Sequence, residues 1–474
     1  MNGRFSAVLA KMLARMIVRM HARKILRAYG SAYRMGCAIV LAFVFAGCGG
    51  KGGAAVTYQC SANAIEIAAL EKELPDFAKR TGIEVKLNPF NGDEKLYAMM
   101  AAGQEPDIFT VNAVVRDRFA AEGRILDLRA LAEDDPFVTN MIPSSRDDGD
   151  AIDGGWYSVS NWAFTAGVYY NRALFAEAGI AAPDSTWTWD DMVATARRLT
   201  RDANGDGKTD RYGVFIGSHF IEAFEQMNHA PLPREALFLS LSPEARDVYA
   251  RYLALMEDGL MPDTRRVQAM GMQAPQMLEN GTVAMLVEAV PNTNLFETLT
   301  IDWALAPLPR FAGKAPRYFR SHSGGLAISA RTRHPKRAWE ALKWIVSGAS
   351  VYQPNPVLRD ADFAGGWERK HARLATTGFR DVWRLAEQQE GGDPRYFVRF
   401  SSFTMAPILE RFQPLLDRLW SRSIGIDELA AAVPGINARV AKDLENTLAT
   451  SAMKPVFRDA LRRQLAEQRP AAGK

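Results

Sequence analysis

Strand-like and helix-like segments alternate along the chain from residue 56 onward, and this alternation constrains the fold most. Apolar runs at residues 56–60, 83–87 and 106–112 have the length and composition of β-strands. Apolar residues recur at helical spacing between residues 67 and 77, and a second helix is expected at residues 93–102. This order predicts an α/β fold with a parallel, doubly wound sheet. Ligands of such sheets bind outside the carboxyl ends of the strands.

Local signals indicate where several helices begin, bend and end. Gly82 is well placed to end the first helix, and Pro75 inside it should bend the helix or start a new turn. Thr188 and Asp191 have the spacing of a capping box at the start of a later helix. The segment after about Asp427 is charged and helical in pattern. A chain of 474 residues is expected to form at least two domains.

The N-terminal segment has the pattern of a sequence that is removed. Eight basic residues and no acidic residue precede Cys48, and the apolar core at residues 37–46 is too short to span a bilayer. A basic region, a short apolar region and small residues before a cysteine predict a lipoprotein signal peptide at residues 1–47. Cys48 would then be lipidated, and residues 48–55 would form a flexible tether. The alternative is an uncleaved amphipathic N-terminus.

Removal of this segment changes what the charge implies. The whole chain carries a formal net charge of +4, and loss of the eight basic residues would leave −4. The basic balance therefore reflects targeting, and nucleic acid is not expected as a partner. Of three cysteines, Cys37 would be removed and Cys48 lipidated, so Cys60 has no partner for an intrachain disulfide. The hydrophobic core must supply the stability.

Several sequence blocks follow one another in an order that is characteristic as a set. They are KRTGIEVKL, AAGQEPDIF, YYNRALFAEAGI, TWTWDDMVATARRLT, DANGDGKTDRYG, LENGTVAML, WALAPLP and GGLAISARTRHPKRAWEALKWI. On these blocks the chain resembles the extracellular solute-binding proteins of bacterial ABC importers, in the group that contains maltose-binding protein. No single block is decisive, and the resemblance covers nearly all of the expected mature chain.

The resemblance implies a two-lobe periplasmic-binding-protein fold, in which each lobe is a doubly wound sheet flanked by helices and a hinge joins them. Each lobe would be built from discontinuous segments: residues 56–158 and 305–346 for the N-lobe, and residues 159–304 and 347–474 for the C-lobe. A small solute, with a carbohydrate as the expected class, would bind between the lobes, which close over it by hinge motion. The closed form would deliver the solute to ABC permease subunits. The protein would be an exported monomer, periplasmic or at the cell surface, held at the membrane by its lipid.

Polar and aromatic residues near the ends of expected strands are candidates for the solute site. Sugar sites combine aromatic faces with planar polar side chains. The candidates are Asn91, Asn112, Trp156, Tyr157, Asn161, Trp162, Glu288, Asn292, Ser323 and Gly324. For each aromatic residue, packing in the core is an equally good interpretation.

Two departures from the family pattern weaken a specific oligosaccharide assignment. The family often has proline after the crossover tyrosine, where this chain has SVSNW, and tryptophan after the later strand, where it has EAVPN. Glu288 could instead pair with a cationic group. A polyol, a phosphorylated polyol or a polyamine therefore stays open as the ligand, as does a sensory or surface lipoprotein without a transport role.

The segment DANGDGKTD at residues 202–210 has partial calcium-loop spacing. The ligands would be Asp202, Asn204, Asp206, the Lys208 carbonyl and Asp210, but Gly213 stands where an EF-hand has its bidentate glutamate. A metal-free turn closed by its own side chains is the favoured interpretation, and structural calcium is the alternative. No other cofactor is expected.

An enzyme has little support in this sequence. The six histidines form no H-E-x-x-H motif, and no G-x-S-x-G motif is present. Pairs of carboxylates such as Glu133 and Asp135 fall in polar segments where solvated charge is the default. The chain is therefore predicted to bind a solute without transforming it.

Overall fold

The computed structural model describes residues 55–60, 64–90, 92–112, 115–142, 145–146, 151–161, 165–230, 234–290, 293–318, 324–352, 357–358, 372–388 and 399–469. The chain divides into two units, Met1–Gly53 and Ala54–Lys474, and every described residue belongs to the second. The expected signal peptide and Cys48 therefore lie outside the described residues. None of the helices described is long and apolar enough to cross a membrane.

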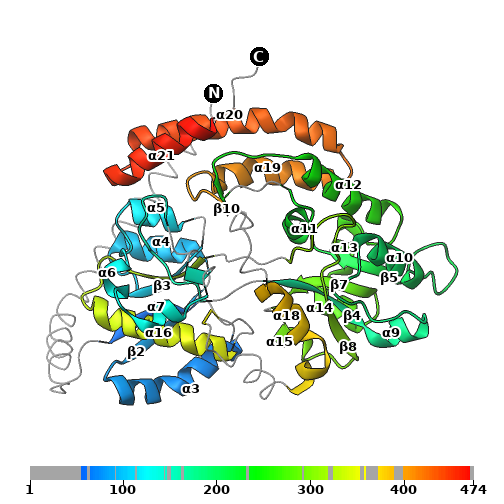
Figure 1. The fold of residues 1–474 in the computed structure, drawn as a ribbon, viewed down its shortest axis with the longest axis horizontal. Helices are drawn as coiled ribbons and strands as arrows, with labels where there is room; N and C mark the ends of the chain where they lie inside the picture. The colour runs from blue at the N-terminus through cyan, green and yellow to red at the C-terminus, as the bar shows by residue number, and fades with distance from the viewer. Residues whose placement is uncertain are drawn as a thin grey trace, which may run out of the picture. The chain divides into compact units, whose positions relative to one another are not determined.

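The first sheet has the strand order β2-β1-β3-β9, and we call this sheet and its helices the first lobe (Figure 1). Its strands are β1 Val56–Cys60, β2 Val85–Pro89, β3 Ile108–Asn112 and β9 Gly324–Ile328. Strand β1 pairs in parallel with β2 and β3, whereas β9 pairs with β3 in antiparallel orientation. The strands predicted from the N-terminal half therefore form the expected parallel core, and a strand from far along the chain adds an antiparallel edge.

Helices cover both faces of the first sheet (Figure 1). Contacts join α3 to β2 and α16 to β1, β9 and α3. The helices of this lobe are α3 Ala64–Thr81, α4 Asp93–Ala102, α5 Arg116–Ala121, α6 Arg129–Ala132, α7 Pro136–Asn140 and α16 Pro335–Tyr352. Helix α3 runs through Pro75 as one element, and Gly82 has the positive φ of a residue that ends a helix.

The second sheet has the strand order β5-β7-β4-β8 and defines the second lobe. Its strands are β4 Ala166–Asn171, β5 Tyr212–Ile216, β7 Val283–Ala289 and β8 Trp303–Pro307. Strand β4 is antiparallel to both neighbours, whereas β5 and β7 are parallel. Both sheets are thus mixed. Because β8 belongs to the second sheet and β9 to the first, the chain changes sheet between Pro307 and Gly324.

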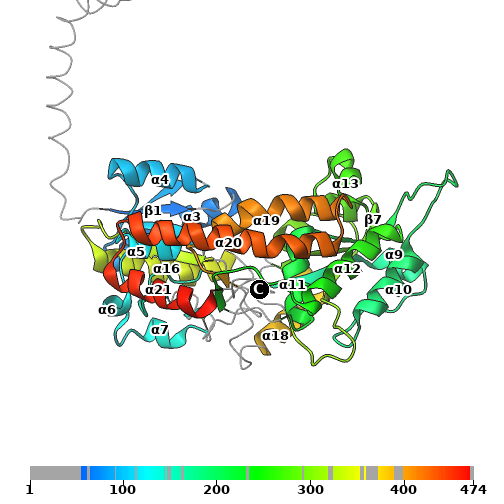
Figure 2. The ribbon, with the colours of Figure 1, turned by 90° about the horizontal axis from the view of Figure 1, so that it is seen from above.

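The other elements are mostly helices that follow or cover the second sheet. They are α9 Arg172–Glu177, α10 Trp189–Leu199, η1 Ser218–Phe220, α11 Ile221–Met227, β6 Arg234–Ala236, α12 Pro243–Glu257, α13 Thr264–Met270, α14 Ala274–Glu279, α15 Thr293–Phe296, η3 Ala372–Thr376, α18 Phe379–Gln388, β10 Arg399–Phe400, α19 Met405–Trp420, α20 Ile426–Thr450 and α21 Pro455–Gln468. Helices α19 and α20 lie side by side (Figure 2). The predicted capping box of α10 is present, with Thr188 and Asp191 each bonding the other's backbone amide.

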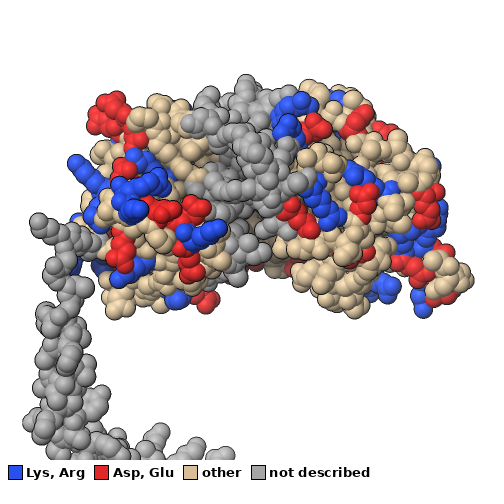
Figure 3. All heavy atoms as spheres, turned by 90° about the horizontal axis from the view of Figure 1, so that it is seen from below, with Lys and Arg blue, Asp and Glu red and all other residues tan. Residues whose placement is uncertain are grey.

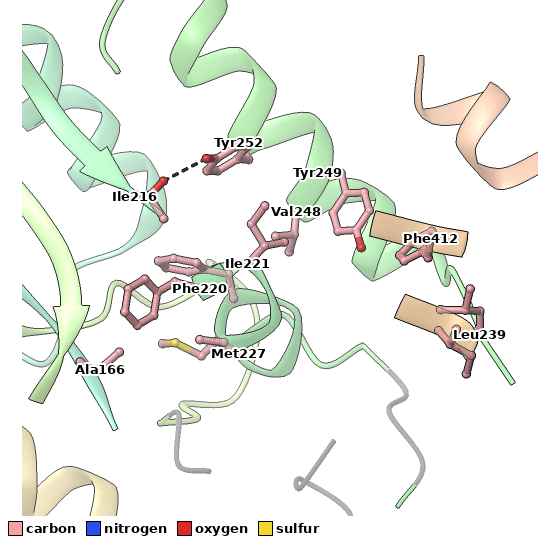
Figure 4. Close-up of a cluster of buried hydrophobic side chains, with 14 of the residues drawn as sticks. Ala166, Ile216, Phe220, Ile221, Met227, Leu239, Val248, Tyr249, Tyr252 and Phe412 are labelled. Atoms are coloured by element: carbon pink, nitrogen blue, oxygen red, sulfur yellow. Dashed lines mark hydrogen bonds between the residues drawn. The ribbon is translucent and has the colours of Figure 1, made fainter. Parts of the chain in front are cut away.

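Apolar side chains pack on both faces of the second sheet. Figure 4 shows Phe220 and Ile221 at the start of α11 close to Val248 of α12, while the Tyr252 hydroxyl donates to the Ile216 carbonyl at 2.9 Å. Trp187, Trp189 and Trp339 are buried. Trp344 is partly buried and stacks on Phe77 at a centroid distance of 4.6 Å. On the face drawn in Figure 3, described basic and acidic side chains are interspersed.

Candidate functional site

The carboxyl end of the first sheet gathers three of the predicted site residues. Asn112 ends β3 and pairs with Gly324, the first residue of β9. On the other side of β9, Val159 pairs with Leu326 in antiparallel orientation, so Asn161 is carried toward the same end of β9. Strand ends of this kind are where ligands of α/β sheets bind. Asn112, Asn161 and Gly324 are therefore the predicted residues that the pairing of distant segments brings together.

The side chains at this sheet end are not all used by the fold. The Asn112 Oδ1 accepts a hydrogen bond from the Val115 amide at 3.2 Å, just before α5 begins. The Asn161 Oδ1 is buried and, among the described residues, has no hydrogen-bond partner. An unpaired buried oxygen costs free energy unless a water or a ligand donates to it. Asn161 is thus the candidate best suited to accept a bond from a solute hydroxyl.

Gly325 allows the crossover segment to lie against β9. A Cβ atom at this position would stand 2.2 Å from the Val159 carbonyl oxygen and 2.8 Å from the Ser160 amide nitrogen. These are backbone atoms, which cannot rotate away. Only glycine therefore permits the close approach that positions Asn161.

Trp156 and Tyr157 lie in the interior. Trp156 is 5% exposed, donates its indole N–H to the Arg146 carbonyl at 2.9 Å, and makes an edge contact with Trp339 at a centroid distance of 6.0 Å. The Tyr157 hydroxyl donates to Asp153 Oδ2 at 2.8 Å, and burial followed by this carboxylate raises the pKa of the tyrosine. Both rings have the environment expected of packing residues, which was one of the two interpretations of the sequence.

An open surface pocket of about 670 Å³ lies beside Trp156 in the first lobe. Asp127, Arg129 and Arg146 are among its lining residues. The Arg129 guanidinium bonds Asp127 in a two-pronged arrangement and, together with backbone amides, lowers the pKa of that carboxyl against the opposing effect of burial. Two of the charges that line this pocket, those of Asp127 and Arg129, therefore neutralise each other.

The remaining candidates are dispersed or lie outside the described residues. Glu288 is half-buried in β7 opposite Gly167, and its Oε1 accepts a hydrogen bond from the Ala289 amide at 2.7 Å. Outside the description lie Asn91, Trp162, Asn292 and Ser323. Their roles stay predictions.

The acidic loop after α10 is exposed and closed by its own hydrogen bonds. The two Asp202 carboxylate oxygens accept the amides of Gly205 and Gly207 at 2.7 and 2.8 Å, and Asp210 Oδ2 accepts the Ala203 amide at 2.8 Å. The side chains of Asn204 and Asp206 each accept the amide two residues on, and Lys208 is exposed. Asx turns explain these contacts, and calcium in this loop stays a prediction.

Helix α11 carries two carboxyl groups that sequence reasoning missed. It follows β5 through η1, so it lies at the carboxyl end of a strand of the second sheet. Desolvation raises the pKa of both Glu222 and Glu225 to about 7. The signal was the placement of two glutamates among the apolar residues of IEAFEQM, a few positions after a strand.

Comparison with known proteins identifies the family and the fold. The sequence matches the bacterial extracellular solute-binding proteins over residues 61–350. In structure the chain is similar to an ABC substrate-binding protein from Listeria monocytogenes in complex with cycloalternan, with a TM-score of 0.67 and 18% identity over 82% of this chain and 98% of that one.

Two further structures have the same fold. A Thermotoga lettingae ABC transporter solute-binding protein bound with α-D-tagatose gives a TM-score of 0.63 and 17% identity over 83% of this chain and 100% of that one. The maltose/maltodextrin-binding domain from Bdellovibrio bacteriovorus bound to maltotriose gives 0.61 and 18% over 84% and 100%. These neighbours are binding proteins, not enzymes. The resemblance and the two-lobe fold drawn from the sequence are confirmed, and the chain belongs to the bacterial extracellular solute-binding protein family.

Proposed function

We propose that this protein captures a carbohydrate and delivers it to the permease of an ABC import system. The observation that carries the proposal is the family match together with the sugars named in all three structural neighbours above. The polar end of the first sheet, with Asn112 and the unpaired Asn161 Oδ1, supplies groups of the kind that hold sugar hydroxyls.

A thermal-shift screen of the purified protein against mono- and oligosaccharides, polyols, amino acids and polyamines tests this proposal. A ligand at one hundred times its dissociation constant adds about 2.7 kcal/mol to the free energy of unfolding, which raises the melting temperature measurably. Stabilisation by a sugar supports the proposal. Stabilisation only by an amino acid or a polyamine would replace the carbohydrate by another solute class.

We also propose that Cys48 is lipidated and holds the exported protein at the membrane. Support comes from the eight basic residues before Cys48, the short apolar core and the small residues Ala46 and Gly47. The variant Cys48→Ala should move the protein from the membrane fraction to the soluble fraction. Its retention in the membrane fraction would refute the lipid anchor.

A further inference from the structure

Helix α11 places two carboxyl groups next to each other. Glu222 and Glu225 are three positions apart, so their side chains are neighbours on the helix surface. Within the described part of the chain, neither forms an ion pair with Lys, Arg or His. Besides desolvation, Glu225 experiences a hydrogen bond with Tyr249 of α12 and the charge of Glu222. Adjacent carboxylates of this kind are unfavourable when both ionise.

The two carboxyl groups differ in their exposure to solvent, and this difference suits a binding site. Glu225 is 9% exposed, whereas Glu222 is exposed to solvent. Desolvation nevertheless dominates the pKa of both carboxyl groups. Water reaches the Glu222 side chain, whereas Glu225 is almost fully enclosed by protein. Glu222 is therefore accessible to a solute, and Glu225 lies behind it.

A second observation comes from the next residue of the helix. Gln226 is 5% exposed, and among the described residues no acceptor lies at full hydrogen-bonding geometry to its Nε2. Desolvation raises the pKa of Glu222, and a hydrogen bond from the Gln226 side chain opposes that rise, so one N–H of the amide is directed toward this acid and the second N–H remains to be satisfied. A buried N–H donor without an acceptor is costly unless a ligand or water accepts its hydrogen bond.

These groups define the chemistry of what they would bind. Two carboxylates accept hydrogen bonds and attract positive charge, whereas the Gln226 amide needs an acceptor such as a hydroxyl oxygen. A sugar with an amino group next to a hydroxyl supplies both. We propose that α11 selects an amino sugar, with Glu222 and Glu225 receiving its ammonium group and Gln226 donating to the neighbouring hydroxyl. This inference rests on the proposed function, because it assumes that the protein captures a carbohydrate.

Among the described residues, no basic side chain of the neighbouring elements forms an ion pair with the two acids. The phenol of Tyr249, on α12, faces Glu225. Burial raises the pKa of this phenol, and the two acids raise it further. From the segment after β8, the Arg317 Nη1 donates to the Gln226 backbone carbonyl at 3.4 Å. The ring of His219 in η1 lies beside Phe220. The ammonium of a ligand would therefore meet two carboxyl groups that no basic side chain of the described residues pairs with.

Calorimetric titration with matched sugars tests the inference. The pairs are glucosamine and glucose, galactosamine and galactose, and the β-1,4-linked glucosamine disaccharide and cellobiose. At pH near 7, at least one amino sugar should bind about tenfold more tightly than its partner, or about 1.4 kcal/mol. Binding should release protons, because the ammonium favours ionised carboxyl groups, and the preference should shrink at about pH 5.5.

Variants separate recognition from folding. Glu222→Gln and Glu225→Gln should each remove the preference for the amino sugar, and Glu222→Gln, at the exposed position, should keep the melting temperature of the parent. Glu257→Gln, an exposed position at the end of α12, is the control and should keep the preference. Equal binding of both members of every pair would overturn the inference and leave carbohydrate capture standing. If no sugar of either kind binds, both proposals fail.

Discussion

Truncation of Trp156 to alanine should destabilise the protein strongly, because this side chain belongs to the core of the first lobe. The ring is 5% exposed, contacts Trp339 edge to face and donates its N–H to the Arg146 carbonyl. Its position beside the crossover also makes it a predicted sugar-stacking residue. The two roles have different consequences for the variant, so the substitution discriminates between them.

The expected loss in the free energy of unfolding is about 3–5 kcal/mol for Trp156→Ala, the range for removal of a large buried aromatic side chain. Trp156→Phe keeps most of the ring contact with Trp339. It removes the indole N–H, whose loss should cost about 1–2 kcal/mol. The difference between the losses in the free energy of unfolding of the two variants therefore measures the contribution of ring packing.

Urea denaturation of both variants and the parent, under one set of conditions, checks these values. Calorimetry with a sugar found in the thermal-shift screen measures the affinity of each protein. The denaturation midpoint should fall while the slope of free energy against urea is unchanged. The reasoning is refuted if Trp156→Ala unfolds at the parent's urea concentration but binds the sugar at least about tenfold more weakly, a loss of about 1.4 kcal/mol. That result would show that the ring faces the ligand and not the core.

Three further outcomes follow from local geometry. Burial raises the pKa of Glu225 from 4.5 to about 7, so the folded state binds the proton of this carboxyl group more tightly than the unfolded state does. The protonated group therefore contributes stability that is fully present below pH 4.5 and is lost as the pH rises through 7. Urea titrations at several pH values should show that Glu225→Gln flattens this pH dependence. Gly325→Ala should lower the free energy of unfolding by about 3 kcal/mol, because the new Cβ meets the Val159 carbonyl oxygen at 2.2 Å. Gly435→Ala in α20, where no atom lies within 4 Å, should raise the free energy of unfolding by about 0.5–1 kcal/mol. Equal effects of the two variants would contradict the steric argument. Calcium at about 1 mM, which matches the dissociation constants of weak extracellular calcium sites, should leave the melting temperature unchanged. The reason is that the Asp202 carboxylate already accepts hydrogen bonds from two backbone amides. A clear rise in the melting temperature would establish a metal site.

Elements whose signals are local were predictable from the sequence. The strands of the first sheet and helix α4 lie where apolar spacing predicts them, and the capping box of Thr188 and Asp191 forms. Pro75 does not end its helix, since α3 continues through it to Thr81. A single unfavourable residue costs a few kcal/mol, and packing of an amphipathic helix can outweigh it.

Long-range pairing was beyond the reach of local signals. The sequence predicts Asn112, Asn161 and Gly324 as separate candidates after separate strands, but nothing local specifies that β9 lies against β3 on one side and against the crossover on the other. The family resemblance supplies the fold, not the register. Trp156 shows the same limit, because an aromatic ring that stacks on a sugar and one that fills a core have the same sequence pattern.

Glu222 and Glu225 show why a site can be invisible in a sequence. Glutamates three positions apart on a helix are ordinary in solvated helices, and the default interpretation is an exposed charged face. What distinguishes this pair is that Glu225 is buried and meets Tyr249 of α12, and that desolvation raises the pKa of both carboxyl groups. The residue types are therefore readable from the sequence, whereas the burial of Glu225 and the rise in both pKa values are properties of the fold. The matched-sugar titration tests directly whether these two carboxyl groups receive the ammonium group of a ligand.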